Sequence, residues 1–270
     1  MTSLTLDCAE AESELLSAEL WEQGATGIQE EELPGGRVRL RAWFGADDDL
    51  AAHFALYDPR VQEEAAVDWE MVSRQAWQPV EVGTRFYLAP EWDESPTPAG
   101  RLRLTVHPGM ALGTGDHPAT HLALAAMEKH VLSGERILDI GTGSGILLQA
   151  AHLLGARGLG CDIEFDNART ARRNLLADAC PPRVFAGSLR AVAAGAADVI
   201  VANINAVTHR ALAAEYARVA RRLVILAGFS GRHAASVERS LAARGWRRLE
   251  QLTERDWVCL ALTPVVPRPR

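Results

Sequence analysis

The sequence predicts an α/β fold made of two parts. From residue 101 onward, strand-like and helical segments alternate five times, which implies a parallel sheet wrapped by helices on both faces. The first 67 residues follow the order strand, helix, strand, strand, helix, strand, which is the α+β arrangement called ferredoxin-like. We therefore expect a ferredoxin-like domain at 1–67, a connector at 68–100 and a Rossmann-like domain at 101–270.

Turn signals and apolar spacing locate the elements of the first domain. The segment 9–23 has the apolar spacing of a helix, and two glycines follow its end. Pro34-Gly35-Gly36 marks a turn, after which apolar residues alternate with arginines as in a half-buried strand. These signals predict strands at 2–6, 28–33, 37–44 and 61–67, and helices at 9–23 and 47–57.

The segment 68–100 has the composition of an ordered connector. It contains three of the seven tryptophans (Trp69, Trp77 and Trp92) and several prolines, whereas flexible linkers are poor in such residues. We expect it to pack against one or both domains, with a short helix at 68–76.

The second domain repeats a strand followed by a helix. Strands are expected at 136–140, 159–162, 184–186, 199–203 and 223–228, and a hairpin at 247–252 and 257–262. Helices are expected at 120–131, 145–154, 166–178, 207–220 and 233–244. Ligands of such sheets bind beyond the carboxyl ends of the strands, where the candidate residues of this chain also lie.

Composition excludes several classes of protein. The net charge is −7 and no short segment gathers Lys or Arg, so we expect no direct nucleic-acid contact and a cationic partner instead. The four cysteines are far apart and form no CxxC pair, which fits neither a zinc site nor a disulfide framework. No signal-peptide pattern and no run of 18 apolar residues is present, so we expect a cytoplasmic protein without membrane contact. We also expect a monomer.

The segment Asp139-Ile-Gly-Thr-Gly-Ser-Gly145 is a strand end, a glycine turn and a helix start. Gly141 and Gly143 remove side chains where backbone would approach a ligand, and Gly145 would let the helix pack tightly on the strand. The spacing is GxGxG rather than the GxGxxG of dinucleotide-binding proteins, and Asp139 suits a cationic group better than a pyrophosphate. A purely structural tight turn is the alternative.

Asp162 ends the next predicted strand, 21 residues after Gly141. An acid at this place can accept hydrogen bonds from both ribose hydroxyls of an adenosine. The alternative is an ordinary cap for the following helix, although Asp166 also fits that role. Together with the glycine turn, Asp162 predicts a cofactor that contains adenosine.

Asn203 ends a buried strand and suits the transfer of a methyl group to an amine. Transfer from a sulfonium is a direct displacement, and an amide oxygen can hold the amine and stabilise the positive charge that it gains. No acid–base pair is required, although a lysine must first lose its proton. The alternative for Asn203 is a turn residue at a strand end.

A glycine-rich segment at 108–121 leads into a predicted helix, and Thr120 or Asp116 could cap its start. His117 and His121 are four residues apart, like some metal ligands, but a third ligand is missing and Pro118 places His117 outside the regular helix. We expect no metal site.

These residues resemble the bacterial methyltransferase family that modifies ribosomal protein L11, known as PrmA. The resemblance covers nearly the whole chain, and its most specific motif is the Gly-Thr-Gly-x-His loop. It is carried by Asp68-Trp69, Ala89-Pro90-Glu91-Trp92, the PGxAxGTGxHxxT loop at 108–120, the segment 139–145, Asp162 and Val201-Ala-Asn-Ile204.

The resemblance implies a seven-stranded class I methyltransferase domain and a ferredoxin-like substrate-recognition domain. The family uses S-adenosylmethionine to trimethylate lysine ε-amines and the N-terminal α-amine of its ribosomal target. By position, Asn203 is the expected catalytic residue that faces the amine. The expected cofactor contacts are Thr114, Thr120, Asp139, Gly141, Thr142, Gly143, Gly145, Asp162 and Asn203.

The sequence also departs from the family pattern. Leu112 stands where Phe is common, and Gly187-Ser188 replaces the acid common after the third strand. Three other functions stay open: methylation of another protein lysine or a small amine, binding of an adenosine cofactor without catalysis, and oxidoreduction with NAD.

Overall fold

The computed structural model describes residues 2–45, 50–63, 78–107 and 117–266. The chain divides into two compact units, Met1–Ala76 and Trp77–Arg270. Residues 78–100 of the predicted connector belong to the second unit, whereas its predicted helix at 68–76 lies outside the described residues.

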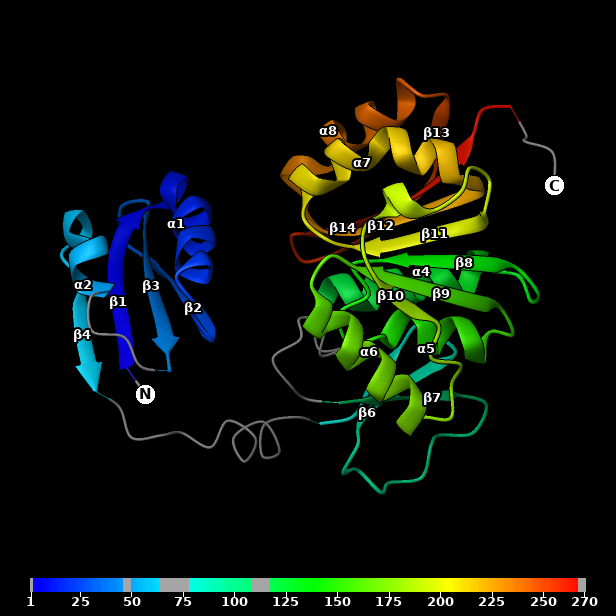
Figure 1. The fold of residues 1–270 in the computed structure, drawn as a ribbon, viewed down its shortest axis with the longest axis horizontal. Helices are drawn as coiled ribbons and strands as arrows, with labels where there is room; N and C mark the ends of the chain where they lie inside the picture. The colour runs from blue at the N-terminus through cyan, green and yellow to red at the C-terminus, as the bar shows by residue number, and fades with distance from the viewer. Residues whose placement is uncertain (1, 46–49, 64–77, 108–116, 267–270) are drawn as a thin grey trace. The chain divides into compact units, whose positions relative to one another are not determined.

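The first unit has the ferredoxin-like order of elements that the sequence predicts (Figure 1). Its sheet has the strand order β2-β3-β1-β4, and every neighbouring pair is antiparallel. The elements are β1 (Thr2–Ala9), α1 (Glu10–Glu22), β2 (Gly27–Leu33), β3 (Arg37–Phe44), α2 (Leu50–His53), a 3₁₀ turn (Ala55–Tyr57) and β4 (Arg60–Glu63).

One face of this sheet forms the core of the unit. Along β3, Val38, Leu40 and Ala42 are buried and pack with Leu16 and Leu20 of α1, because alternate side chains of a strand point to the same face. The intervening side chains of β3 face the other way, and most of them are arginines.

The second unit contains a seven-stranded sheet in the order β10-β9-β8-β11-β12-β14-β13, as the fold class predicts. Strand β14 alone runs antiparallel to its neighbours β12 and β13, so the terminal hairpin completes an otherwise parallel sheet. The strands are β8 (Arg136–Ile140), β9 (Arg157–Asp162), β10 (Val184–Ala186), β11 (Ala197–Asn203), β12 (Ala220–Ser230), β13 (Trp246–Glu254) and β14 (Trp257–Pro264).

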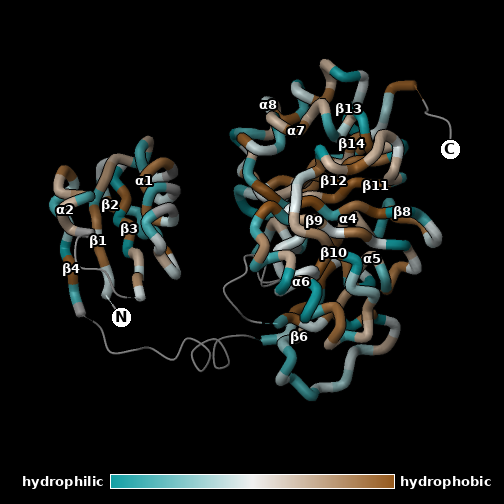
Figure 2. Tube along the Cα trace, in the orientation of Figure 1, coloured by the Kyte–Doolittle hydropathy of each residue, from teal (hydrophilic) through white to brown (hydrophobic). Residues whose placement is uncertain are grey.

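Helices cover both faces of this sheet. They are α4 (Pro118–His130), α5 (Ile146–Leu153), α6 (Phe165–Ala177), α7 (Ala206–Val219) and α8 (Gly231–Ala242), with a 3₁₀ turn at Leu189–Ala191. Along β11, Val199 and Val201 pack in the core under α4 and α5, whereas Ile200 and Ala202 pack in the core under α7 and α8. Burial on both faces explains the continuous apolar run of this strand, which is brown in Figure 2.

A second, three-stranded sheet was not predicted. It consists of β5 (Val80–Val82), β6 (Phe86–Pro90) and β7 (Leu102–Val106), with β6 and β7 parallel. Phe86, Leu88 and Leu104 are buried in the core that α4 and α5 share with the main sheet. None of the described helices is long and apolar enough to cross a membrane, and all four cysteines are free and buried.

Candidate active site

Three polar side chains lie at the carboxyl ends of three neighbouring strands. Asp139 is near the end of β8, Asp162 ends β9 and Asn203 ends β11, and β8 lies between the other two strands. From β8 the chain runs to β9 and β10 on one side of the sheet. It then crosses to β11, on the other side of β8. This is the topological switch point, where open α/β sheets bind their ligands.

The glycine turn brings backbone close to neighbouring elements. Gly141 has a φ of +67°, and a Cβ atom built on it would lie 2.6 Å from Cγ2 of Ile204, in the loop after β11. Gly145 caps α5, and a Cβ atom there would press against Ala171 of α6 at 3.4 Å. Gly145 therefore lets α5 and α6 approach closely, and its expected role in packing the helix on the strand stays a prediction.

Asp139 is a buried carboxylate with spare acceptor capacity. Its side chain accepts a hydrogen bond from the Thr142 hydroxyl at 2.7 Å through Oδ2, and the residue is 1% exposed. Its Oδ1 atom is buried and has no hydrogen-bond partner within the described part of the chain. Burial, with the nearby Asp162 charge, raises the pKa of Asp139 to about 7. A cationic ligand would satisfy Oδ1 and favour the ionised form.

Asp162 ties the glycine turn to the start of α6. Its Oδ2 accepts from the Gly143 backbone N–H at 3.1 Å, and its Oδ1 accepts from the Glu164 N–H at 3.0 Å. Oδ1 also accepts from the Asn167 side-chain amide at 3.4 Å, so the second acceptor position of Oδ2 is the one that a ribose hydroxyl could use. Asp166 lies inside the first turn of α6 and pairs with Arg169, so it is not the helix cap considered from the sequence.

Asn203 and Thr120 meet although 83 residues separate them. The Asn203 Nδ2 group donates to the Thr120 hydroxyl at 3.1 Å, and Thr120 is buried in the first turn of α4. A Cβ atom on Gly228 of β12 would lie 2.9 Å from Asn203 Oδ1, so the backbone there passes close to the amide oxygen. The side chain is thereby oriented from two elements.

The start of α4 differs from the expectation. His117 is its cap, because Nδ1 of His117 accepts from the Ala119 N–H at 3.1 Å and Pro118 occupies the first helical position. Thr120 lies inside the helix, so the expectation that it caps the helix is wrong. Asp116, the other candidate cap, and Thr114, an expected cofactor contact, lie outside the described residues.

His209 supports the site and was missed from the sequence. It is fully buried in α7, and its Nε2 lies 2.8 Å from the Ala227 carbonyl, which also accepts from the Ile204 N–H at 3.1 Å. Its Nδ1 lies 3.1 Å from the Tyr216 hydroxyl. Burial lowers the pKa of His209 to about 4, so the neutral ring donates from Nε2 and accepts at Nδ1. His209 thus holds the turn that follows Asn203.

A histidine between two carboxylates follows the end of β7. His107 Nδ1 lies 2.7 Å from Glu91, and its Nε2 lies 2.9 Å from Asp178 just after α6. The hydrogen bond to Asp178, followed by that to Glu91, raises the pKa of His107. The His107 ring thus links the three-stranded sheet to the end of α6. Among the described residues, no group of three or more His, Cys, Asp or Glu could hold a metal ion.

This geometry fits a ligand with a cationic group for Asp139, vicinal hydroxyls for Asp162 and a reacting centre near Asn203. A family model described as ribosomal protein L11 methyltransferase (PrmA) matches residues 46–264. The ribosomal protein L11 methyltransferase of Thermus thermophilus is 37% identical over 247 residues, which cover 90% of this chain and 91% of that protein. The Myxococcus xanthus protein of the same name is 31% identical and covers 96% of this chain and 97% of its own.

A solved structure agrees with these relatives. The ribosomal protein L11 methylase of Lactobacillus delbrueckii subsp. bulgaricus matches with a TM-score of 0.65 and 27% sequence identity, covering 70% of this chain and 99% of that one. The predicted class I methyltransferase fold is thus confirmed. The chain belongs to the ribosomal protein L11 methyltransferase (PrmA) family.

Proposed function

We propose that this methyltransferase uses S-adenosylmethionine to methylate lysine ε-amines and the N-terminal α-amine of a large-subunit ribosomal protein, L11. The observation that carries the proposal is the grouping of Asp139, Asp162 and Asn203 at three adjacent strand ends. The printed names of the relatives in Thermus and Myxococcus support the choice of target. We further propose that it acts in the cytoplasm as a monomer, without direct nucleic-acid contact.

The residues present fit this cofactor. The unpartnered Oδ1 of Asp139 suits the ammonium of its methionine part, and Asp162 suits the ribose hydroxyls. Gly141 and Gly143 would let backbone approach it, and Thr114, Thr120, Thr142 and Gly145 complete the proposed contacts. When bound, the cofactor supplies a methyl group on a positively charged sulfur.

Asn203 is the proposed catalytic residue. Because its Nδ2 is engaged by Thr120, its Oδ1 is the atom left to accept a hydrogen bond from the incoming amine. That oxygen would align the amine and stabilise the positive charge that develops on nitrogen. A free lysine has a pKa near 10.4, so removing its proton at pH 7 costs about 4–5 kcal/mol. His209 is not a suitable base, since both of its ring nitrogens are engaged.

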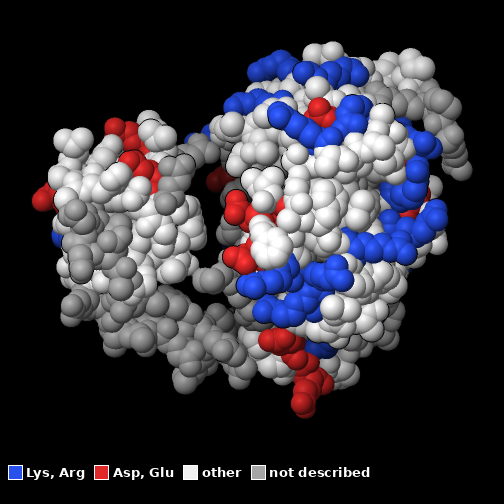
Figure 3. Space-filling model, viewed as in Figure 1, with Lys and Arg blue, Asp and Glu red and all other residues white. Residues whose placement is uncertain are grey.

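The first unit is proposed to recognise the protein substrate. Residues 1–76 contain 17 Asp and Glu but five Arg and no Lys, for a net charge of −12, whereas residues 77–270 carry a net charge of +5. Figure 3 shows several clusters of Lys and Arg on the visible face of the second unit. An acidic unit attracts a basic protein, and ribosomal proteins must be basic enough to bind RNA.

The test is to incubate the enzyme with purified ribosomal protein L11 and S-adenosylmethionine and to measure the mass of the protein. Increments of one methyl group support the proposal. An unchanged mass, with S-adenosylhomocysteine still bound by calorimetry, would assign the enzyme to another amine. Binding of NAD without S-adenosylhomocysteine would refute the methyltransferase chemistry itself.

A further inference from the structure

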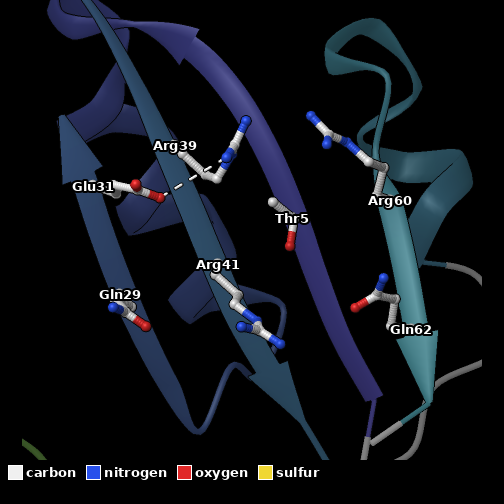
Figure 4. A pocket seen from close by; sticks show the side chains of 7 residues that line it. All are labelled: Thr5, Gln29, Glu31, Arg39, Arg41, Arg60 and Gln62. Atoms are coloured by element: carbon white, nitrogen blue, oxygen red, sulfur yellow. Dashed lines mark ion pairs between the residues drawn. The ribbon is translucent and has the colours of Figure 1, made fainter. Parts of the chain in front are cut away.

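Polar side chains also gather away from the strand ends that form the candidate site. In the first unit, polar side chains from all four strands line a cavity of about 280 Å³ (Figure 4). Two of its arginines, Arg39 and Arg60, are paired within the unit, because the carboxylate of Asp7 accepts hydrogen bonds from both. In the second unit, a buried amide side chain between α5 and α6 contacts the backbone of the glycine turn, residues 141–145.

This amide belongs to Asn174, a polar residue on an otherwise apolar helix face. The buried residues of α6 are Ala168, Ala171, Asn174 and Leu175, and Asn174 is 4% exposed. Burying an amide costs free energy unless the amide is hydrogen-bonded, and Asn is a weak helix former. Helix stability therefore does not explain this residue, and the bonds of its side chain indicate its role.

The Asn174 side chain binds the turn just before α5 begins. Its Nδ2 group donates to the Ser144 carbonyl at 3.0 Å. Gly145 is the cap of α5, and its carbonyl accepts from the Gln149 N–H at 3.0 Å as the first bond of the helix. Because Ser144 precedes this cap, the bonding pattern of the helix does not orient its carbonyl.

Glycines on both sides of Ser144 make its peptide groups easy to reorient. Gly143 has a φ of +52° and Gly145 a φ of +87°, and glycine adopts either sign of φ at little cost. The Gly145 N–H donates to the Thr142 carbonyl at 2.8 Å, which holds one side of the peptide group between Ser144 and Gly145. The bond from Asn174 holds the other side, so the two bonds together fix one orientation of this peptide group.

Further contacts fix the helix that carries Asn174. One turn before it, Ala171 packs against the glycine turn. One turn after it, Asp178 at the end of α6 accepts from the Nε2 group of Gln149 in α5. Gln149 is also 4% exposed, and its Oε1 accepts from the Thr105 N–H of β7 at 3.0 Å. Residues three or four apart share one face of a helix, so these contacts hold the Asn174 amide against the turn.

We infer that Asn174 is a positioning residue for the cofactor, acting through the Ser144 peptide of the glycine turn. The inference rests on the proposed function, because it takes this turn to be the place where S-adenosylmethionine binds. The amide of Asn174 holds the backbone in one conformation before the cofactor arrives, so that binding does not have to order it. Loss of the amide should then weaken cofactor binding more than it weakens the fold.

The test measures the Kd for S-adenosylhomocysteine by calorimetry and the melting temperature of the cofactor-free, full-length enzyme. Asn174→Ala removes the bond and introduces a good helix former, whereas Asn174→Asp places a second acceptor opposite the Ser144 carbonyl. We expect the Kd to rise about fivefold in Asn174→Ala and about tenfold or more in Asn174→Asp. The KM for S-adenosylmethionine should rise similarly, while the KM for the ribosomal protein stays within about twofold of wild type.

Two neighbours of Asn174 on α6 provide the matched controls. Leu175→Ala removes a buried apolar side chain, so it should lower the melting temperature more than Asn174→Ala does but leave the Kd within about twofold of wild type. Arg173→Gln removes the contact of the Arg173 guanidinium with Oδ1 of Asn174 and should change neither quantity, because the bond to Ser144 remains.

The outcomes separate positioning from a purely structural role. A wild-type Kd in both Asn174 variants would overturn the inference. An equal rise in Kd in Leu175→Ala would also overturn it, since cofactor affinity would then simply follow the stability of α6. If Asn174→Asp does not fold, Asn174→Ala decides by the same criteria. A wild-type enzyme that does not bind S-adenosylhomocysteine at all would overturn the proposed function, and the inference with it.

Discussion

Replacing Asp139 by Asn should have opposite effects on cofactor binding and on stability. The unpartnered Oδ1 is the proposed acceptor for the cofactor ammonium, and a hydrogen bond between charged groups contributes about 1.5–3 kcal/mol. Asp139→Asn should therefore raise the Kd for S-adenosylhomocysteine roughly 10- to 150-fold. The geometry of the turn should be kept, because the Asn oxygen can still accept from Thr142.

The stability effect follows from the raised pKa. The pKa of Asp139 is about 7 in the fold against an ordinary value of 3.8, so the folded state binds the extra proton and loses stability as pH rises from about 4 to about 7. The full penalty above pH 7 is up to about 4 kcal/mol. Asn removes this penalty but leaves a buried N–H group without a partner, which costs about 1–3 kcal/mol. A net gain of about 1–3 kcal/mol remains at pH 8.5.

Two measurements check this prediction. Urea denaturation of the cofactor-free protein at pH 5 and pH 8.5 gives the change in the free energy of unfolding, and calorimetry with S-adenosylhomocysteine gives the Kd. Asp166→Asn is the control, since Asp166 is a nearby carboxylate whose side chain is 81% exposed. A wild-type Kd for Asp139→Asn, or a loss of stability that is larger at pH 8.5 than at pH 5, would refute the reasoning.

Three further changes test other parts of the site. Asp162→Ala should raise the Kd for S-adenosylhomocysteine at least tenfold by removing ribose acceptors, and an unchanged Kd would contradict that role. His209→Leu should lower kcat more than the affinity for S-adenosylhomocysteine, and His209→Gln, which can still donate to the Ala227 carbonyl, should restore part of it; equal kcat for the two variants would exclude positioning by this bond. The raised pKa of His107 stabilises the fold below its unfolded pKa, near 6.5, and this stabilisation is lost as pH rises through the folded pKa. His107→Gln should therefore reduce the change in melting temperature between pH 6 and pH 9. An unaltered pH dependence of the melting temperature would show that His107 is not the responsible group.

Local signals in the sequence were enough to predict most elements and to bring the candidate site residues to one edge of the sheet. The glycine turn, Asp162 and Asn203 each follow a strand, and parallel strands end at the same edge, so their proximity could be predicted. The sequence also contained a signal for the N-terminal cap of α4. Proline favours the first helical position, so Pro118 indicates that His117 is the cap. Thr120 and Asp116 were expected instead, because Thr and Asp are generally preferred at this position.

Other features depend on contacts that no local pattern contains. Strands β6 and β7 are parallel and pair across an intervening loop that contains prolines, so no local pattern indicates their pairing, although Gly83 marks the turn between antiparallel β5 and β6. The partners of His209 come from the next strand and the far end of its own helix, and only the fold brings them to the ring. In the sequence, His209 is one polar residue in an amphipathic helix and resembles a surface position.

In the proposed reaction, the described side chains around Asn203 would position an amine without taking its proton. Asn203 and Thr120 have no group that titrates near neutral pH, and the one histidine that supports their turn is held neutral by burial. Both ring nitrogens of His209 are engaged, one by the Tyr216 hydroxyl and the other by the Ala227 carbonyl. The ring therefore holds the backbone at Ala227, which in turn accepts from the Ile204 N–H. Under the proposed function, the proton of a lysine would have to leave before the amine reaches Asn203. Direct displacement requires only this, because the nitrogen needs a free lone pair and a fixed direction rather than a base in contact with it.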